Sequence, residues 1–341
     1  MWFIVFLVAC FTSVLAMEKD VHLFARPFGF CDGSPLTCDV VQAWAPRLSE
    51  DEEELIGDWL VSHPELIERL IVQDVAPSER ISKCVETKEW LDTQEDLKNL
   101  ARSNFIFEDP SGKYVIKISS YTSRLQNQIM AAGIPAYFTK VSPEVLEQVA
   151  ACDTFQTVSY IPTFLRYQEL KQDRGLDHLH VPETFLMHVP GRPQELCDSN
   201  YVIVQKKDDL LRREDVLARL PSLTKEQIYE TVLLIFYCAL WNMRTNLQIG
   251  TGGTIIVNDL EQPNVTSPEG FYLQEVRRKK SLPFFGKARF KRNVEAGIRE
   301  LYELFDPAGV QAQWIKECSC IIAGMYNKNL KTKIIFVFPE K

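Results

Sequence analysis

Short runs of alternating apolar and polar residues predict strands in the middle of the chain. The clearest case is residues 104–118, NFIFEDPSGKYVIKI, where two such runs flank a Pro-Ser-Gly turn and predict a hairpin. In the second run, YVIKI, the first, third and fifth residues share one face and Lys117 lies on the other. Further strands are predicted within 180–191, 200–211 and 332–341.

Apolar residues at helical spacing dominate the rest of the chain. An acidic helix begins after Ser49 and is interrupted before Pro64, because a residue preceding proline disfavours the helical conformation. The sequence TKEQ at 224–227 has the pattern of a capping box and opens an apolar helix over 225–241. Other helices are expected over 78–101, 120–153, 161–176, 293–305 and 309–326.

The order of these elements predicts the class of fold. A strand-rich part comes first, and a helical part follows in which one Gly-rich hairpin, between Asn246 and Asp259, is the interruption. We therefore expect an α+β, two-lobed layout behind an N-terminal helical extension. A length of 341 residues is enough for one large domain or a bilobal pair.

The first sixteen residues, MWFIVFLVACFTSVLA, are apolar and end in small residues. They predict a secretory signal peptide, with Val14 and Ala16 at the small-residue positions before the cleavage point. A membrane anchor is the alternative, but the run is short for a spanning helix. No later run is long enough either, so we expect an exported protein, secreted or periplasmic, with no transmembrane helix in the mature chain.

Charge points to protein partners more than to nucleic acid. The net charge is −8, yet residues 277–292, from Arg277 to Arg292, hold eight basic residues and no acid. Without those eight positive charges the net charge of −8 becomes −16 on the remainder, which disfavours nucleic acid. The basic segment is either a solvated loop leading into a helix or a site for an acidic protein partner or an anionic membrane surface.

Cysteines give a second indication of compartment. Eight of the nine remain after the leader, and Cys31 and Cys38 flank a short turn in which a local disulfide is feasible. Cys318 and Cys320 stand two apart on a predicted helix and do not suit a bond to each other. Buried free thiols in a reducing compartment remain the alternative.

The hairpin between Asn246 and Asp259 carries the candidate chemistry. It places an amide oxygen and a carboxylate side by side, and these are hard ligands of the kind that Mg²⁺ prefers. Glu261 adds a second carboxylate two residues later. The alternative is that these acids only cap a turn before Pro263.

Lys117 is the second candidate, because a lysine in the apolar middle of a strand must reach an anion or a solvated edge. An ordinary lysine on an edge strand is the alternative.

Taken in order, the strand lysine, a helix glutamate, a strand before an apolar helix and the Asn–hairpin–Asp segment resemble the protein-kinase fold over roughly residues 100–326. The pattern resembles the aberrant kinase-like proteins of some host-associated bacteria more than it resembles any regular kinase family. The resemblance implies that ATP or GTP binds with Mg²⁺. The implied nucleotide-binding residues are Lys117, Glu169, Gln205, Lys206 and Lys207, and the implied metal ligands are Asn246, Asp259 and Glu261.

Within this resemblance, Glu169 would pair with Lys117, and backbone groups around Gln205 to Lys207 would contact the base. A solvated helix glutamate is the alternative for Glu169.

The catalytic loop departs from the family. The position of the proton-accepting Asp is occupied by Trp241 or, with a one-residue deletion, by Asn242, and neither accepts a proton as a carboxylate does. No G-x-G-x-x-G occurs. The resemblance therefore implies a pseudokinase that acts by binding nucleotide, protein or both. An active divergent Mg²⁺-dependent phosphotransferase and an interaction protein that binds no nucleotide are the alternatives.

The expected domains combine the predicted leader with this resemblance. They are a signal peptide at 1–16, the N-terminal helical extension at 17–100, a kinase-like N-lobe with a helical insertion at 101–207 and a helical C-lobe at 208–341.

Overall fold

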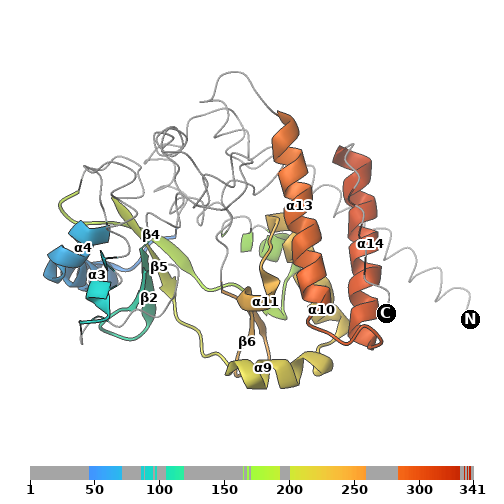
Figure 1. Ribbon diagram of the computed structural model, residues 1–341, viewed down its shortest axis with the longest axis horizontal. Coiled ribbons are helices and arrows are strands. Elements are labelled where there is room, and N and C mark those ends of the chain that lie inside the picture. The colour runs from blue at the N-terminus through green and yellow to red at the C-terminus, as the bar shows by residue number, and fades with distance from the viewer. Residues whose placement is uncertain are drawn as a thin grey trace, which may run out of the picture.

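The computed structural model has an α+β fold with two sheets and flanking helices (Figure 1). It describes residues 46–70, 86–87, 89–94, 97, 105–118, 164, 167–168, 170–192, 200–258, 283–330, 334, 336 and 338. The expected α+β class is confirmed. The predictions for the leader, for Cys31 and Cys38, and for the helix over 120–153 lie outside the described residues.

The larger sheet has four antiparallel strands in the order β1-β2-β5-β4. Their bounds are β1 Phe105–Glu108, β2 Tyr114–Ile118, β4 Thr184–His188 and β5 Tyr201–Lys206. The hairpin predicted over 104–118 is confirmed, and Asp109 closes it by accepting the backbone N–H of Ser111 at 2.9 Å and that of Tyr114 at 2.7 Å. Gly112 supplies the positive φ of 71° that the turn requires.

One face of this sheet is covered by two N-terminal helices, α3 (Glu50–Ser62) and α4 (Pro64–Leu70). The predicted interruption before Pro64 is confirmed, since α3 ends with His63 as its C-cap. The contact surface joins helix and strand residues in one buried cluster. Its members include Ile56, Leu60, Leu66, Phe105, Phe107, Tyr114, Ile116, Ile118, Met187 and Val204.

A hydrogen bond ties the start of α3 to strand β2. The Tyr114 hydroxyl donates to Oε1 of Glu52 at 2.6 Å, and the same carboxylate completes the capping box with Ser49. Burial of the ring, helped by this bond, raises the pKa of Tyr114 well above its usual range. Helices α3 and α4 are thus packed on the strands that follow them.

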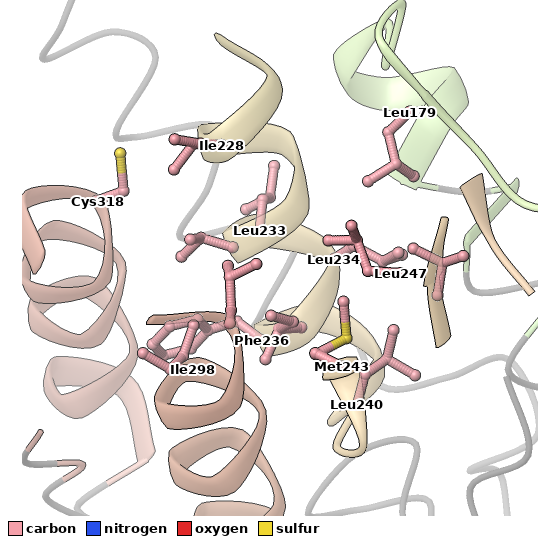
Figure 2. Close-up of a cluster of buried hydrophobic side chains, with 14 of the residues drawn as sticks. Leu179, Ile228, Leu233, Leu234, Phe236, Leu240, Met243, Leu247, Ile298 and Cys318 are labelled. Atoms are coloured by element: carbon pink, nitrogen blue, oxygen red, sulfur yellow. The ribbon is translucent and has the colours of Figure 1, made fainter. Parts of the chain in front are cut away.

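The second half is built around the buried helix α10 (Lys225–Cys238). Helices α13 (Pro283–Tyr302) and α14 (Val310–Leu330) pack along it, as Figure 2 shows for Phe236, Ile298 and Cys318. Two shorter elements precede α10: α9 (Arg213–Arg219) and the 3-10 turn η2 (Leu220–Ser222). The buried residues of this half form a hydrophobic cluster separate from the one beneath α3.

The smaller sheet has the order β3-β7-β6 and packs against α10. Its strands are β3 Leu179–His180, β6 Leu247–Ile249 and β7 Ile255–Val257, and the one-turn helix α11 (Met243–Asn246) leads into β6. The predicted hairpin after Asn246 is confirmed as β6 and β7. Strand β3 pairs with β7 in parallel.

Two sequence-based boundaries are wrong, and one predicted strand is not found at its described residues. Helix α10 ends at Cys238 because Ala239 turns left-handed, with φ of 53°. Helix α13 starts at Pro283, inside the basic segment and ten residues before the predicted start at 293. The described residues of the predicted last strand lie in no strand: Ile334 is buried in the helical cluster, and Phe336 packs edge-on against Phe236.

None of the described helices combines the length and the apolar character that crossing a membrane requires.

Candidate functional site

Lys117 lies on the face of the larger sheet opposite α3, as its alternation predicts. Its ammonium group donates to the backbone carbonyl of Asn258 at 3.4 Å, across 141 residues of sequence. The side chain of Gln205, on the neighbouring strand β5, donates to the same carbonyl at 3.2 Å and to the Thr184 hydroxyl at 3.3 Å. Two donors from the larger sheet therefore converge on the residue that ends the β6–β7 hairpin.

Asn246 lies at the other end of that hairpin. Its backbone carbonyl accepts the N–H of Asn258 at 3.1 Å, so the hairpin is closed directly below the contact with Lys117. The Asn246 side chain is buried, and its Oδ1 accepts the Thr245 hydroxyl at 3.0 Å. Lys117, Gln205, Asn246 and Asn258 thus form one connected group.

The proposed metal carboxylates begin one residue beyond this group. Asp259 and Glu261 lie outside the described residues, as does Glu169, so their roles stay predictions. Among the residues that the structure does describe, no group of three or more His, Cys, Asp or Glu side chains is arranged to hold a metal.

The loop at the predicted position of the catalytic base runs from Ala239 to Asn242, and both of these residues are left-handed. Trp241 is half-buried and Asn242 is exposed. Gly297 of α13 lets the helix approach the loop, because a Cβ atom there would lie deep inside the carbonyl oxygen of Leu240. The loop conformation is therefore fixed by contact with α13.

A half-buried carboxylate from α13 contacts α11, the helical turn that follows this loop. Burial raises the pKa of Glu300, and the backbone amides of Met243 and Arg244, which hydrogen-bond to the carboxylate, partly offset that rise. A second acid of α13, Glu303, forms an ion pair with the Arg244 side chain. Both acids therefore serve to hold α11.

The segment predicted to contact the nucleotide's base, Gln205 to Lys207, makes hydrogen bonds within the protein. The N–H of Lys206 donates to the carbonyl of Glu183 at 2.8 Å, and that of Lys207 to the carbonyl of Lys113 at 2.8 Å. Their side chains form exposed ion pairs, Lys206 with Glu183 and Lys207 with Glu108. Of these three residues, Gln205 is the one whose side chain lies beside Lys117, and the nucleotide role of all three stays a prediction.

Sequence reasoning missed Asp208, which follows this segment. One of its oxygens lies 3.5 Å from Nε2 of His180 on β3. The other is buried and has no hydrogen-bond partner among the described residues. Burial raises the pKa of Asp208, while His180 and Lys206 act in the opposite direction. A His–Asp contact across 28 positions leaves no local signal that could have revealed it.

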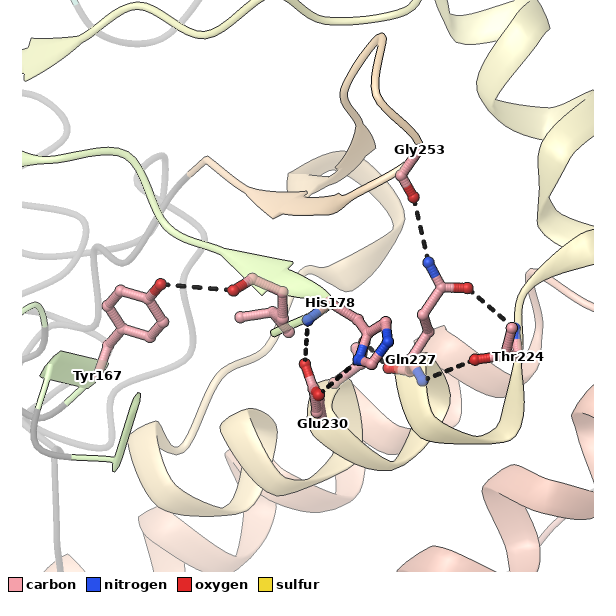
Figure 3. Close-up of polar contacts among 8 residues, drawn as sticks. Tyr167, His178, Thr224, Gln227, Glu230 and Gly253 are labelled. Carbon is pink, nitrogen blue, oxygen red and sulfur yellow. Dashed lines mark hydrogen bonds and ion pairs between the residues drawn. The ribbon is translucent and has the colours of Figure 1, made fainter. Parts of the chain in front are cut away.

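A polar network on α10 holds the smaller sheet in place (Figure 3). The carboxylate of Glu230, which is buried, accepts the N–H of His178 at 3.0 Å and lies 2.9 Å from its Nδ1. Gln227, which completes the capping box with Thr224, also donates to the carbonyl of Gly253 at 3.1 Å. The capping-box pattern predicted the contact of Gln227 with Thr224 but not its contact with Gly253, which depends on the hairpin packing nearby.

Comparison with protein-family models finds no match, and comparisons with curated proteins and with solved structures find none either.

Proposed function

We propose that this protein is a degenerate kinase-like domain that binds a nucleotide with Mg²⁺ and acts as a pseudokinase. In this proposal the larger sheet is the N-lobe, the helical part is the C-lobe, and residues 207–212 connect them. The separate hydrophobic clusters of the two parts support such a bilobal arrangement.

One observation carries the proposal: the contact of Lys117 with the carbonyl of Asn258. The resemblance requires the strand lysine and the metal-binding Asp to face each other across the nucleotide phosphates. Asn258 directly precedes Asp259, so the contact supports that juxtaposition between residues far apart in sequence.

The arrangement also provides a way for the site to open. Gln205 and Lys117 both donate to Asn258, so the carbonyl keeps a partner when the ammonium turns toward a phosphate. Asn258 is half-buried, and leaving its carbonyl unpaired would cost at most roughly 1–3 kcal/mol. Gln205 removes most of that penalty from nucleotide binding.

The loss of catalysis follows from the residues at the predicted position of the catalytic base. Trp241 and Asn242 offer no carboxylate, and general base catalysis typically contributes about 10²–10⁴-fold. Glu300 and Glu303 of α13 bind the backbone and side chain of α11, which follows this loop. We therefore expect binding without efficient phosphoryl transfer, with an acidic protein partner engaged by the segment from Arg277 to Arg292.

The decisive experiment is a melting curve with millimolar ATP or GTP, with and without Mg²⁺. A ligand at 100 times its dissociation constant stabilises the folded state by about 2.7 kcal/mol, so a clear Mg²⁺-dependent rise in Tm is expected. Lys117→Ala and Asp259→Asn should both reduce the rise. Lys113→Ala removes an exposed lysine from the same hairpin and is the matched control.

Each alternative has its own outcome in this test. A melting curve that no nucleotide changes would identify a pure interaction protein. Robust phosphate transfer from labelled ATP that Asp259→Ala abolishes would identify an active phosphotransferase.

A further inference from the structure

We propose that Arg213 is a positioning residue that holds Asn246 in place as a Mg²⁺ ligand. The inference rests on the proposed function and adds a residue that the resemblance does not assign. It starts from α11, a single turn of four residues, Met243–Asn246. A turn this short is unstable alone, because nucleating a helix fixes several residues for one hydrogen bond. Contacts from elsewhere must hold it.

Arg213 supplies two of these contacts from the first turn of α9. One guanidinium nitrogen donates to the carbonyl of Arg244 at 2.6 Å, and another donates to the carbonyl of Leu247 at 3.3 Å. These two carbonyls lie on either side of Asn246 in the sequence. A rigid planar guanidinium that binds both fixes the distance between them, and so fixes the backbone that carries Asn246.

Glu300 holds the opposite end of the same turn. It accepts the amides of Met243 and Arg244, so a carboxylate lies at the start of α11 and a guanidinium lies at its end. This is the polarity that the backbone dipoles of a helical turn favour. The two charged groups come from different helices and clamp α11 between them.

Through its position, α9 connects this clamp on α11 to the predicted nucleotide site. Helix α9 follows the connecting segment that leaves β5, and that segment pairs with the hairpin through the N–H of Leu211 and the carbonyl of Ile249 at 2.9 Å. Arg213 thereby links the connection between the two parts to the predicted metal ligand. Disturbing Arg213 should affect the Mg²⁺ more than the nucleotide itself.

The test is a Mg²⁺ titration at fixed nucleotide. For Arg213→Ala we expect Mg²⁺ affinity to fall about tenfold, the size of effect that loss of a charge-assisted hydrogen bond produces. Nucleotide affinity without Mg²⁺ should stay as in the wild type. Arg212→Ala is the matched control. The Arg212 guanidinium is 85% exposed, and Asp215 is its one partner among the described contacts.

A double variant separates positioning from a general loss of structure. If Arg213 acts through Asn246, then Arg213→Ala combined with Asn246→Ala should bind Mg²⁺ no more weakly than Asn246→Ala alone. Additive losses would overturn the inference. Arg213→Lys, which keeps the charge but not the two-pronged geometry, should give an intermediate loss if the fold of the alanine variant proves too unstable to measure.

Hydrogen exchange without nucleotide keeps this inference distinct from the proposed function. Peptides covering 243–249 should exchange faster in Arg213→Ala than in the wild type and in Arg212→Ala. If the wild type binds no Mg-nucleotide, the proposed function fails, whereas faster exchange still supports the clamp. Unchanged exchange in Arg213→Ala overturns the clamp whatever the wild type binds.

Discussion

His178 and Glu230 form a pair in which the acid is buried and the imidazole is 47% exposed. The hydrogen bond to Glu230 raises the pKa of His178 above its ordinary value, and nearby Asp177 and Glu226 add to the rise while burial opposes it. The folded protein therefore binds the imidazole proton more tightly than the unfolded chain does. The contribution to stability is complete below the ordinary pKa of 6.5 and disappears as pH rises through the raised value.

We expect the free energy of unfolding to decrease as pH rises from about 6 to 8, in a step that His178→Gln lacks. The step should be small because the imidazole is half-exposed and its charge is screened. Urea unfolding of both proteins over this pH range measures it, and the difference between them cancels the titration of other groups. Identical slopes in the two proteins would contradict the expectation.

At the scale of single residues, the alternation of YVIKI was enough to predict the face on which Lys117 lies. The direction of a side chain in a strand depends only on its position. The role of Gln205 was not predictable in the same way. Its side chain reaches Asn258, 53 residues away, and that contact exists only once the two parts have packed together.

At the scale of helices and strands, two glycines in long helices differ sharply in their surroundings. Gly297 of α13 faces the carbonyl of Leu240, and a Cβ atom there would also lie 3.0 Å from the Ile235 side chain. Gly324 of α14 has nothing within 4 Å of the same position. The first glycine is needed for packing and the second is not.

Gly297→Ala should destabilise the protein by at least about 1–3 kcal/mol, because the helix must move away from the loop. Gly324→Ala should stabilise it by roughly 0.5–1 kcal/mol, because alanine restricts the unfolded chain and favours the helix. Urea unfolding followed by circular dichroism measures both. Equal effects of the two substitutions would show that the contact between α13 and the loop is looser than described.

Element prediction succeeded where the signal is local. The capping box at Thr224 marks the start of α10 because its hydrogen bonds join residues three apart. Strand β3 has two residues and depends on pairing with β7, and α11 depends on Arg213 and Glu300, so periodicity contains no trace of either. The end of α10 was missed because Ala239, rather than glycine or asparagine, takes the left-handed position.

For the whole molecule, the two hydrophobic clusters matter most. In Figure 1 the larger sheet with α3 and α4 lies at one end, and α10, α13 and α14 lie at the other. Few of the described hydrogen bonds join these two parts. The main ones are those that Lys117 and Gln205 donate to Asn258. Each part buries its own core, so each is expected to unfold as a cooperative unit.

Hydrogen exchange in increasing urea should therefore sort the slowest peptides into two groups with different transitions. One group should contain β1, β2, β5 and α3, and the other α10 and α14. Mg-nucleotide should bring the two transitions together, because it binds only when both parts are folded. A single transition for all peptides without ligand would contradict this expectation.

The left-handed conformation of Asn242 bears on how this chain can change over evolutionary time. Asn and Asp are the non-glycine residues that adopt this conformation most readily, so an aspartate fits the backbone at position 242 as it stands. Every asparagine codon becomes an aspartate codon through one base substitution. Under the proposed function, the absent proton acceptor is thus one mutation away, with no loop to rebuild.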